Sequence, residues 1–230
     1  MTNKGRRSAV VHVRTLRRVA ANGDTGSRQE GKRRTRAALL SGALCLLADR
    51  SLAGLSLREV TREAGIVPTA FYRHFASMDE LGVSLVDESM RSLRHMIREA
   101  RRTLAPLAQD VIAGSVATLV AGLRTTESHV RFLVKERYGG VPEVRRAIAV
   151  ELKLFAGELA TDLGRFPGLA SWSSDDLRMA ADLMVAAMLN IVMVLLEVPR
   201  NDPAAEREVV RAAERQLRLI VLGMAQWRSG

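Results

Sequence analysis

Apolar residues recur every three or four positions along most of this 230-residue chain. The clearest run is Val144, Ile148, Leu152, Phe155 and Leu159, at spacings of four, four, three and four. This spacing places an apolar stripe on one side of an α-helix, whereas a half-buried strand alternates with a period of two. Because aromatic residues make up only 4% of the chain, the composition also disfavours sandwiches and barrels. We predict an all-α fold.

Capping and stop signals divide this pattern into separate helices. The S-x-x-E pattern, typical of a helix N-terminus, occurs at Ser56 and again at Ser77. The glycine at position 65 separates two short helices, which is the layout of a helix-turn-helix. The predicted helices are 32–48, 57–64, 68–75, 78–104 (ended by Pro106), 107–123, 128–137, 143–163, 175–198 and 203–227.

A length of 230 residues is enough for two modest domains, and the helices suggest two folded parts behind a short arm. We expect residues 1–31 to form a basic flexible arm and residues 32–77 a three-helix domain with the helix-turn-helix. Residues 78–230 are expected to form a helical bundle that binds an effector and dimerises.

The net charge is concentrated at the N-terminus. Residues 1–36 hold 11 of the 35 Lys and Arg but only two of the 25 acidic residues, which accounts for +9 of the net +10. A basic arm of this kind favours a polyanion as partner. We interpret it as an arm that follows nucleic acid, with added phosphate contacts and counterion release.

Two other interpretations of the arm stay open. Residues 1–23 are rich in Arg and lack acidic residues, a composition that also fits a transit peptide. A start codon placed too far upstream would instead leave an extension without function.

The sequence offers little that is typical of an enzyme or a metalloprotein. Cys45 is the one cysteine, so neither an internal disulfide nor a CxxC motif can form, and a reducing compartment is expected. The four histidines are scattered, and no P-loop, nucleophile elbow or dinucleotide fingerprint is present. We predict no catalytic residue, no cofactor and no metal site, and we expect Cys45 to pack in the core.

The two C-terminal helices carry sustained apolar seams. The helix over 175–198 is apolar nearly all round, so it needs partners on two sides. Its longest predominantly apolar stretch, 183–196, has 14 residues, fewer than the roughly 20 that span a bilayer. We therefore predict pairing between two chains into a four-helix bundle rather than a membrane span. The predicted dimer interface comprises Met184, Ala187, Ile191, Val194, Leu217, Ile220 and Met224.

The stretch Leu57 to Leu81, LREVTREAGIVPTAFYRHFASMDEL, resembles the helix-turn-helix signature of the TetR family of bacterial transcription regulators. It has the Ala64-Gly65 turn, a Tyr followed shortly by Phe, and a polar pair before Glu-Leu. Two positions depart from the pattern: Val67-Pro68 replaces the usual capping Ser, and Ser77-Met78 replaces a frequent Lys. The resemblance implies a homodimer that binds a palindromic operator.

Side chains at the start of a recognition helix reach base edges in the major groove. Thr69 and Ala70 suit thymine methyl groups, and Arg73 has the geometry for guanine. Tyr72 and His74 are expected to contact the DNA backbone. Phe71 and Phe75, four residues apart, are expected in the core. The full set of predicted DNA contacts is Arg33, Arg34, Arg36, Ser56, Arg58, Thr69, Ala70, Tyr72, Arg73 and His74.

A second resemblance concerns the effector. The segment PTAFYRHF, together with residues 130–140 and 144–148, is similar in sequence to segments of TetR-like repressors of unsaturated fatty acid synthesis and desaturation. This similarity implies an acyl-CoA or related acyl thioester as the small hydrophobic effector. Methionine adapts to irregular ligands, which fits such a pocket. The predicted pocket residues are Leu93, Ile97, Phe132, Phe155, Met184 and Met188.

Together these features predict a cytoplasmic, sequence-specific DNA-binding repressor under the control of a small hydrophobic effector. Two alternatives remain. The chain could coat nucleic acid without sequence preference through its basic arm, or it could be a ligand-binding dimer that no longer binds an operator.

Overall fold

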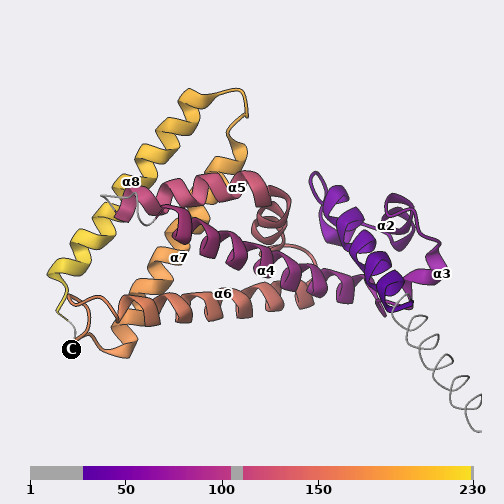
Figure 1. Ribbon diagram of the computed structural model, residues 1–230, viewed down its shortest axis with the longest axis horizontal. Coiled ribbons are helices and arrows are strands. Elements are labelled where there is room, and N and C mark those ends of the chain that lie inside the picture. Colours follow the sequence, from indigo (N-terminus) through magenta and orange to yellow (C-terminus); the bar gives the residue numbers. More distant parts are fainter. Residues whose placement is uncertain (1–27, 105–110, 229–230) are drawn as a thin grey trace, which may run out of the picture.

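The computed structural model describes residues 28–104 and 111–228 (Figure 1). All regular elements in these two ranges are helical, which confirms the all-α prediction. Most of the predicted basic arm and Pro106 lie outside the described residues. A first helix covers residues 28–46. It is followed by η1 (Leu52–Gly54), α2 (Leu57–Glu63), α3 (Pro68–Phe71), α4 (Met78–Leu104), α5 (Val111–Glu136), α6 (Pro142–Leu163), α7 (Ser174–Glu197) and α8 (Pro203–Gln226).

The helices form a small N-terminal part and a larger bundle, joined by α4 (Figure 1). The first helix, η1, α2 and α3 cluster at one end of the molecule. From there α4 runs into the bundle, where it packs against α5 and α6. Helix α7 packs against α5, α6 and α8. This layout matches the predicted three-helix domain followed by a helical domain.

The predicted capping signals are real helix starts. Ser56 and Glu59 form a complete capping box: the Glu59 N–H donates to Ser56 Oγ, and the Ser56 N–H donates to Glu59 Oε2 at 2.9 Å. Ser77 Oγ accepts from the Glu80 N–H at 3.1 Å at the start of α4. At α8, Asp202 caps two backbone N–H groups. Each cap satisfies donors that the helix itself leaves unpaired.

One predicted break proves to be a kink. We expected separate helices over 107–123 and 128–137, but α5 is continuous and leaves helical geometry only at Thr126, with φ −123° and ψ 19°. The hydroxyls of Thr125 and Thr126 both donate to the carbonyl oxygen of Gly122 at 2.9 Å. Such side-chain bonds to the preceding turn bend helices. The second half of α5 can therefore point toward the N-terminal part.

The largest core runs from the N-terminal part into the bundle. It joins Phe71 and Phe75 to Leu85 of α4, Phe132 of α5 and Val144 of α6, all nearly inaccessible to solvent. A Cβ atom at Gly82 would lie only 2.4 Å from Leu52 Cδ2, so α4 and η1 approach closely at this glycine. Because this core contains residues from both sides of position 77, the two parts share one core. The boundary at residue 77 therefore stays a prediction about which part binds DNA.

Three placements differ from the sequence prediction. Cys45 was expected in the core but is exposed, because it lies on the side of the first helix that faces away from the three-helix core. Ile191 and Leu217 were expected at a dimer interface but are 3% and 5% exposed. Both lie in a core cluster with Val116 and Ala213 of the same chain. The period of a seam marks an apolar face but does not identify its neighbour.

Helix α7 is long and apolar enough to cross a membrane by length and composition alone, although only a third (33%) of its most apolar window is buried within the chain. Core helices of bundles meet the same criterion. Met179, Leu183, Met193 and Val194 fall on one exposed side of α7. We call these four residues the α7 face.

Candidate DNA-binding surface and effector cavity

A glycine turn positions the short helix α3. Gly65 has φ 67°, a left-handed conformation that glycine adopts without a steric penalty. Pro68 follows at the first position of α3, where its fixed φ suits a helix start. Val67 precedes it without a side-chain cap, as the departure from the family pattern predicts. The sharp turn sets α3 at an angle to α2 and presents its outer side to solvent.

The side chains of this segment point to two sides, one buried and one exposed. Phe71 is 0% and Phe75 2% exposed, and their ring centroids lie 5.6 Å apart. Tyr72, between them, is 66% exposed, and its ring is nearly perpendicular to that of Phe71, at an interplanar angle of 82°. Thr69 and Arg73 are also exposed. The two phenylalanines therefore anchor the segment and leave three hydrogen-bonding side chains free to meet a partner.

His74 is a half-buried histidine in a positively charged setting. Its Nδ1 atom is buried and has no hydrogen-bond partner within the described residues. Burial, together with the nearby charges of Lys32, Arg36 and Arg73, lowers the pKa of His74 below its ordinary value. At neutral pH the ring is therefore uncharged. A phosphate placed against it would favour the protonated form.

This setting predicts a pH dependence of DNA binding. If a phosphate contacts His74, binding raises its pKa and takes up a proton, so we expect affinity to rise as pH falls from about 8 to 6. Fluorescence anisotropy with a labelled duplex at fixed ionic strength measures it. His74→Gln keeps a polar side chain but cannot titrate, so its affinity should stay flat. A dependence of equal size in His74→Gln would rule out this contact.

The remaining predicted DNA contacts are arranged differently. Arg33 and Arg58 are exposed, and Arg34 pairs loosely with Glu30 at 3.5 Å. The Arg36 guanidinium lies 5.2 Å from the Phe75 ring centroid, which fixes its direction. Ser56 is committed elsewhere, as described next.

The Ser56 hydroxyl serves mainly as a helix cap. It donates to Glu59 Oε2 at 2.7 Å while accepting from the Glu59 backbone N–H. Hydrogen bonds from Arg50 and then Ser56 hold the pKa of Glu59 at about 2. Any contact from Ser56 to DNA would have to share this hydroxyl.

A small apolar cavity of about 80 Å³ lies within the bundle. It holds four of the six predicted pocket residues, namely Leu93, Ile97, Phe155 and Met188. Phe132 and Met184 do not line it: Phe132 is fully buried in the core that reaches the N-terminal part, and Met184 packs on a separate core cluster of α6 and α7. The complete lining is Met90, Leu93, Met96, Ile97, Leu119, Leu123, Val130, Leu133, Val134, Arg137, Ile148, Leu152, Phe155, Val185, Met188, Leu189 and Val192.

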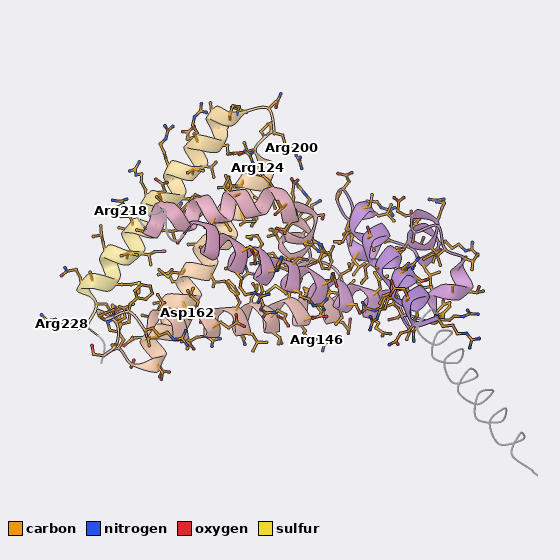
Figure 2. The ribbon with its side chains drawn as sticks, viewed as in Figure 1. Arg124, Arg146, Asp162, Arg200, Arg218 and Arg228 are labelled. Atoms are coloured by element: carbon orange, nitrogen blue, oxygen red, sulfur yellow. The ribbon has the colours of Figure 1, made fainter. Side chains whose placement is uncertain are left out.

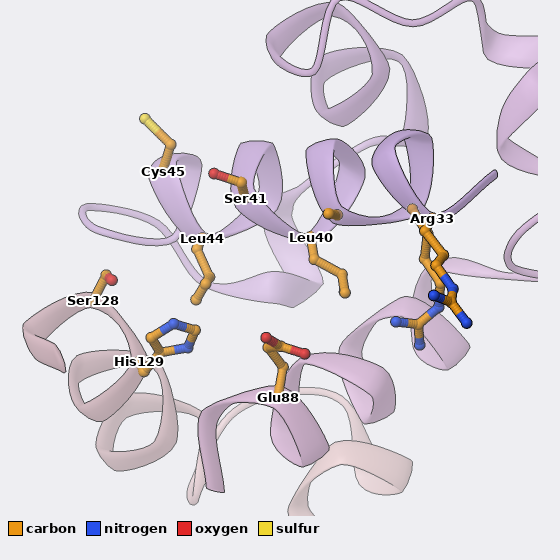
Figure 3. Close-up of a pocket in the computed structure, with 10 residues that line it drawn as sticks. Arg33, Leu40, Ser41, Leu44, Cys45, Glu88, Ser128 and His129 are labelled. Atoms are coloured by element: carbon orange, nitrogen blue, oxygen red, sulfur yellow. The ribbon is translucent and has the colours of Figure 1, made fainter. Parts of the chain in front are cut away.

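A second, open groove of about 570 Å³ lies between the first helix, α4 and the second half of α5 (Figure 3). We call it the junction groove. Its lining comprises Arg33, Arg36, Ala37, Leu40, Ser41, Leu44, Cys45, Glu88, Ser128 and His129. The sequence analysis did not predict it, because its walls come from segments up to 96 positions apart (Arg33 and His129).

The end of α5 contacts the loop that precedes α2. Lys135 Nζ donates to the carbonyl oxygen of Ala48 at 2.6 Å. Glu136 is 2% exposed, and its Oε1 accepts from the Leu52 N–H at 2.8 Å. Its Oε2 is buried without a partner in the described part of the chain. Leu133 and Arg137 on the same turn line the apolar cavity, so one helical turn contacts both the cavity and the N-terminal part.

Charged residues on the bundle surface link its helices. Arg124 Nη2 contacts both carboxylate oxygens of Glu206 at 2.7 Å, joining α5 to α8. Glu127, just after the kink, pairs with Arg131 at 2.8 Å and with Arg200 at 2.5 Å. Figure 2 labels Arg124 and Arg200 among the charged side chains on the surface of the bundle. Hydrogen bonds from Arg131 and the charge of Arg200 lower the pKa of Glu127. Among the described residues, no group of three or more His, Cys, Asp or Glu side chains is placed to hold a metal ion.

A short, anchored, outward-facing helix behind a glycine turn, mounted on a helical bundle, defines the class of helix-turn-helix proteins. Comparison with known proteins narrows this class. Residues 39–84 match the sequence model for bacterial regulatory proteins of the tetR family. These residues contain α2, the turn and α3.

Solved structures share the fold of most of the chain. A TetR family transcriptional regulator from Chloroflexus aurantiacus J-10-FL is 17% identical with a TM-score of 0.58, over 82% of this chain and 92% of that one. Salmonella enterica GusR is 18% identical with a TM-score of 0.60, over 84% and 96%. A TetR-family regulator from Streptomyces coelicolor is 19% identical with a TM-score of 0.58, over 81% and 96%. The chain thus carries the TetR-family helix-turn-helix domain and has the fold of TetR-family transcriptional regulators.

Proposed function

We propose that this protein is a homodimeric, cytoplasmic transcriptional repressor that binds a palindromic operator and responds to a small hydrophobic effector. The observation that carries the proposal is the presentation of Thr69, Tyr72 and Arg73 on the anchored segment that ends in Phe75. Two such segments in a dimer would enter successive major grooves about 34 Å apart.

Arg73 is the residue whose loss tests this proposal most simply. A bidentate arginine–guanine contact discriminates against the wrong base by about 1–3 kcal/mol. We expect Arg73→Ala to lower the ratio of operator to random-duplex affinity by about 5-fold to 150-fold. Arg146→Ala is the matched control, because Arg146 is exposed on α6 and pairs with Glu143 of the same helix. Competition anisotropy measures both ratios. An unchanged ratio in Arg73→Ala would show that Arg73 does not read a base, whereas a ratio near one in the unsubstituted protein would favour an architectural protein without operator preference.

The apolar cavity supports a hydrophobic effector. Arg137 is the one charged residue among its described lining residues, and the other lining side chains are aliphatic, Met or Phe. At about 80 Å³ the cavity is smaller than the roughly 300–1,000 Å³ of ordinary ligand pockets, so an acyl chain enters only if the flexible Met side chains of the lining move apart, with a carboxyl or thioester end toward Arg137. The phosphates of a coenzyme A head would have to remain outside this lining, since buried charges need partners. We propose an acyl thioester as effector, bound by its chain.

Gly122 offers a test of effector binding at this cavity. A Cβ atom at Gly122 would lie 2.0 Å from Met96 Sδ, so Gly122→Ala must displace the Met96 side chain, which lines the cavity. We expect oleoyl-CoA to bind this variant about tenfold more weakly in isothermal titration calorimetry. Gly223→Ala is the control, because nothing lies within 4 Å of its added methyl group. Equal affinity in both variants would place the ligand elsewhere.

The end of α5 gives this cavity a route to the DNA-binding part. A ligand in the cavity would contact Leu133 or Arg137 at the end of α5. The same turn bonds to Ala48 through Lys135 and to Leu52 through Glu136, so a shift of this turn would reach the N-terminal part. The ligand shifts the operator affinity only by its differential affinity for the two arrangements of this turn.

A further inference from the structure

We propose that the junction groove is a second ligand site, distinct from the apolar cavity, and that it takes a small organic carboxylate bearing a hydroxyl donor. The groove's volume of about 570 Å³ falls within the ordinary range for small-molecule sites. It holds charged, polar and apolar groups in separate places, and each of them constrains the ligand.

One end of the groove is cationic. Arg33 and Arg36, one turn apart on the first helix, bring two guanidinium groups to this end (Figure 3). Arg36 is held in place over the Phe75 ring. Guanidinium groups bind carboxylates through paired, charge-assisted hydrogen bonds. The anionic group of the ligand therefore belongs at this end.

The middle of the groove accepts hydrogen bonds. Glu88 on α4 points into the groove, and its Oε2 accepts from Arg91 at 2.8 Å, which leaves Oε1 for a donor on the ligand. His129 faces it from α5, with its Nδ1 atom 3.0 Å from the hydroxyl of buried Ser89. Burial lowers the pKa of His129, although Glu88 opposes this shift. A fully anionic ligand would meet the Glu88 carboxylate unfavourably, whereas a hydroxyl would donate to it.

The floor of the groove is apolar. Ala37, Leu40 and Leu44 lie along one side of the first helix, at spacings of three and four. Such a floor suits the hydrocarbon body of the ligand, such as an aromatic ring between the carboxylate and the hydroxyl. The site thus selects a molecule with an anion at one end, a donor at the other and an apolar centre.

Occupation of this groove has a consequence that depends on the proposed function. Arg33 and Arg36 are also predicted phosphate contacts, so a carboxylate bound to them would compete with DNA. The ligand would at the same time link the first helix to α4 and α5.

Titration calorimetry of the full chain without DNA tests the site, so its outcome is independent of operator binding. The probe is 4-hydroxyphenylacetate, which has all three features. We expect it to bind with a Kd below about 1 mM. Phenylacetate lacks the donor and should bind several-fold more weakly. Tyrosol lacks the anion and should bind about tenfold more weakly.

Two pairs of variants locate the bound probe. Arg33→Ala should weaken binding about tenfold, while Arg34→Ala, one residue along and paired with Glu30 outside the groove, should not. Ser128→Trp fills the groove from an exposed position and should abolish binding. Leu93→Trp fills the apolar cavity and should leave binding unchanged. Absence of binding up to 1 mM, equal loss in the two arginine variants, or loss in Leu93→Trp alone would each overturn the proposal.

Discussion

Phe71→Ala should lower the free energy of unfolding by about 3–5 kcal/mol, the cost usually found when a buried Phe is cut back to Ala. The Phe71 side chain is 0% exposed and belongs to the core that joins the N-terminal part to α4, α5 and α6. Its loss leaves a cavity beneath α3 and removes the contact with the Phe75 ring. Urea denaturation followed by circular dichroism measures the change.

Tyr72→Ala is the matched control for this prediction. Tyr72 is the next residue and also aromatic, but it is 66% exposed. Its removal should change the unfolding free energy by less than about 1 kcal/mol, while weakening binding to every duplex alike, as expected for a phosphate contact. If Phe71→Ala cost no more than Tyr72→Ala, α3 would not be held by the core as described.

Leu183→Glu should convert the protein into a folded monomer and abolish operator binding. Leu183 is 55% exposed and belongs to the α7 face, and α8 exposes Leu219 and Leu222 as well. Exposed apolar residues on one side of a long helix are typical of an interface. A carboxylate buried without a partner costs several kcal/mol, and a symmetric dimer incurs that cost twice.

Sedimentation equilibrium and competition anisotropy read out this prediction. Val150→Glu is the control, because Val150 is similarly exposed, at 56%, but lies on α6 rather than on the α7 face. It should remain a dimer that binds DNA. Because Leu183 is exposed in the single chain, the variant is expected to keep its helical content. A Leu183→Glu dimer that binds DNA unchanged would refute an interface at the α7 face.

The local elements were predictable because their signals lie close together in the sequence. Ser56 and Glu59 form the expected capping box, and Gly65 forms the expected turn. Phe71 and Phe75 are buried as their spacing of four predicts. Each of these features depends on residues within one or two turns. The sequence pattern alone is therefore sufficient to predict the helix-turn-helix.

Features that depend on which helices meet were not predictable from spacing. Helix α7 is apolar nearly all round, so its period could not show that Ile191 would face α5 and α8 while Leu183 faced solvent. Glu136 was not singled out either, because its partner Leu52 lies 84 positions away. Its neighbours Lys135 and Arg137 are charged as well, so Glu136 has the sequence context of an ordinary surface residue. Apart from Ile191 and Leu217, which are buried within the chain, the predicted dimer contacts remain predictions, as do the predicted DNA contacts.

The measurement that tests the central claim most directly is a mobility-shift assay on the full chain with the DNA upstream of its own gene. Excess random duplex is titrated into the mixture, with and without oleoyl-CoA. The account predicts a retarded band that resists the competitor, is lost in Leu183→Glu, and changes in intensity with the thioester. Retardation that random duplex removes completely, on this region and on every site recovered by a genome-wide binding search, would contradict a sequence-specific regulator.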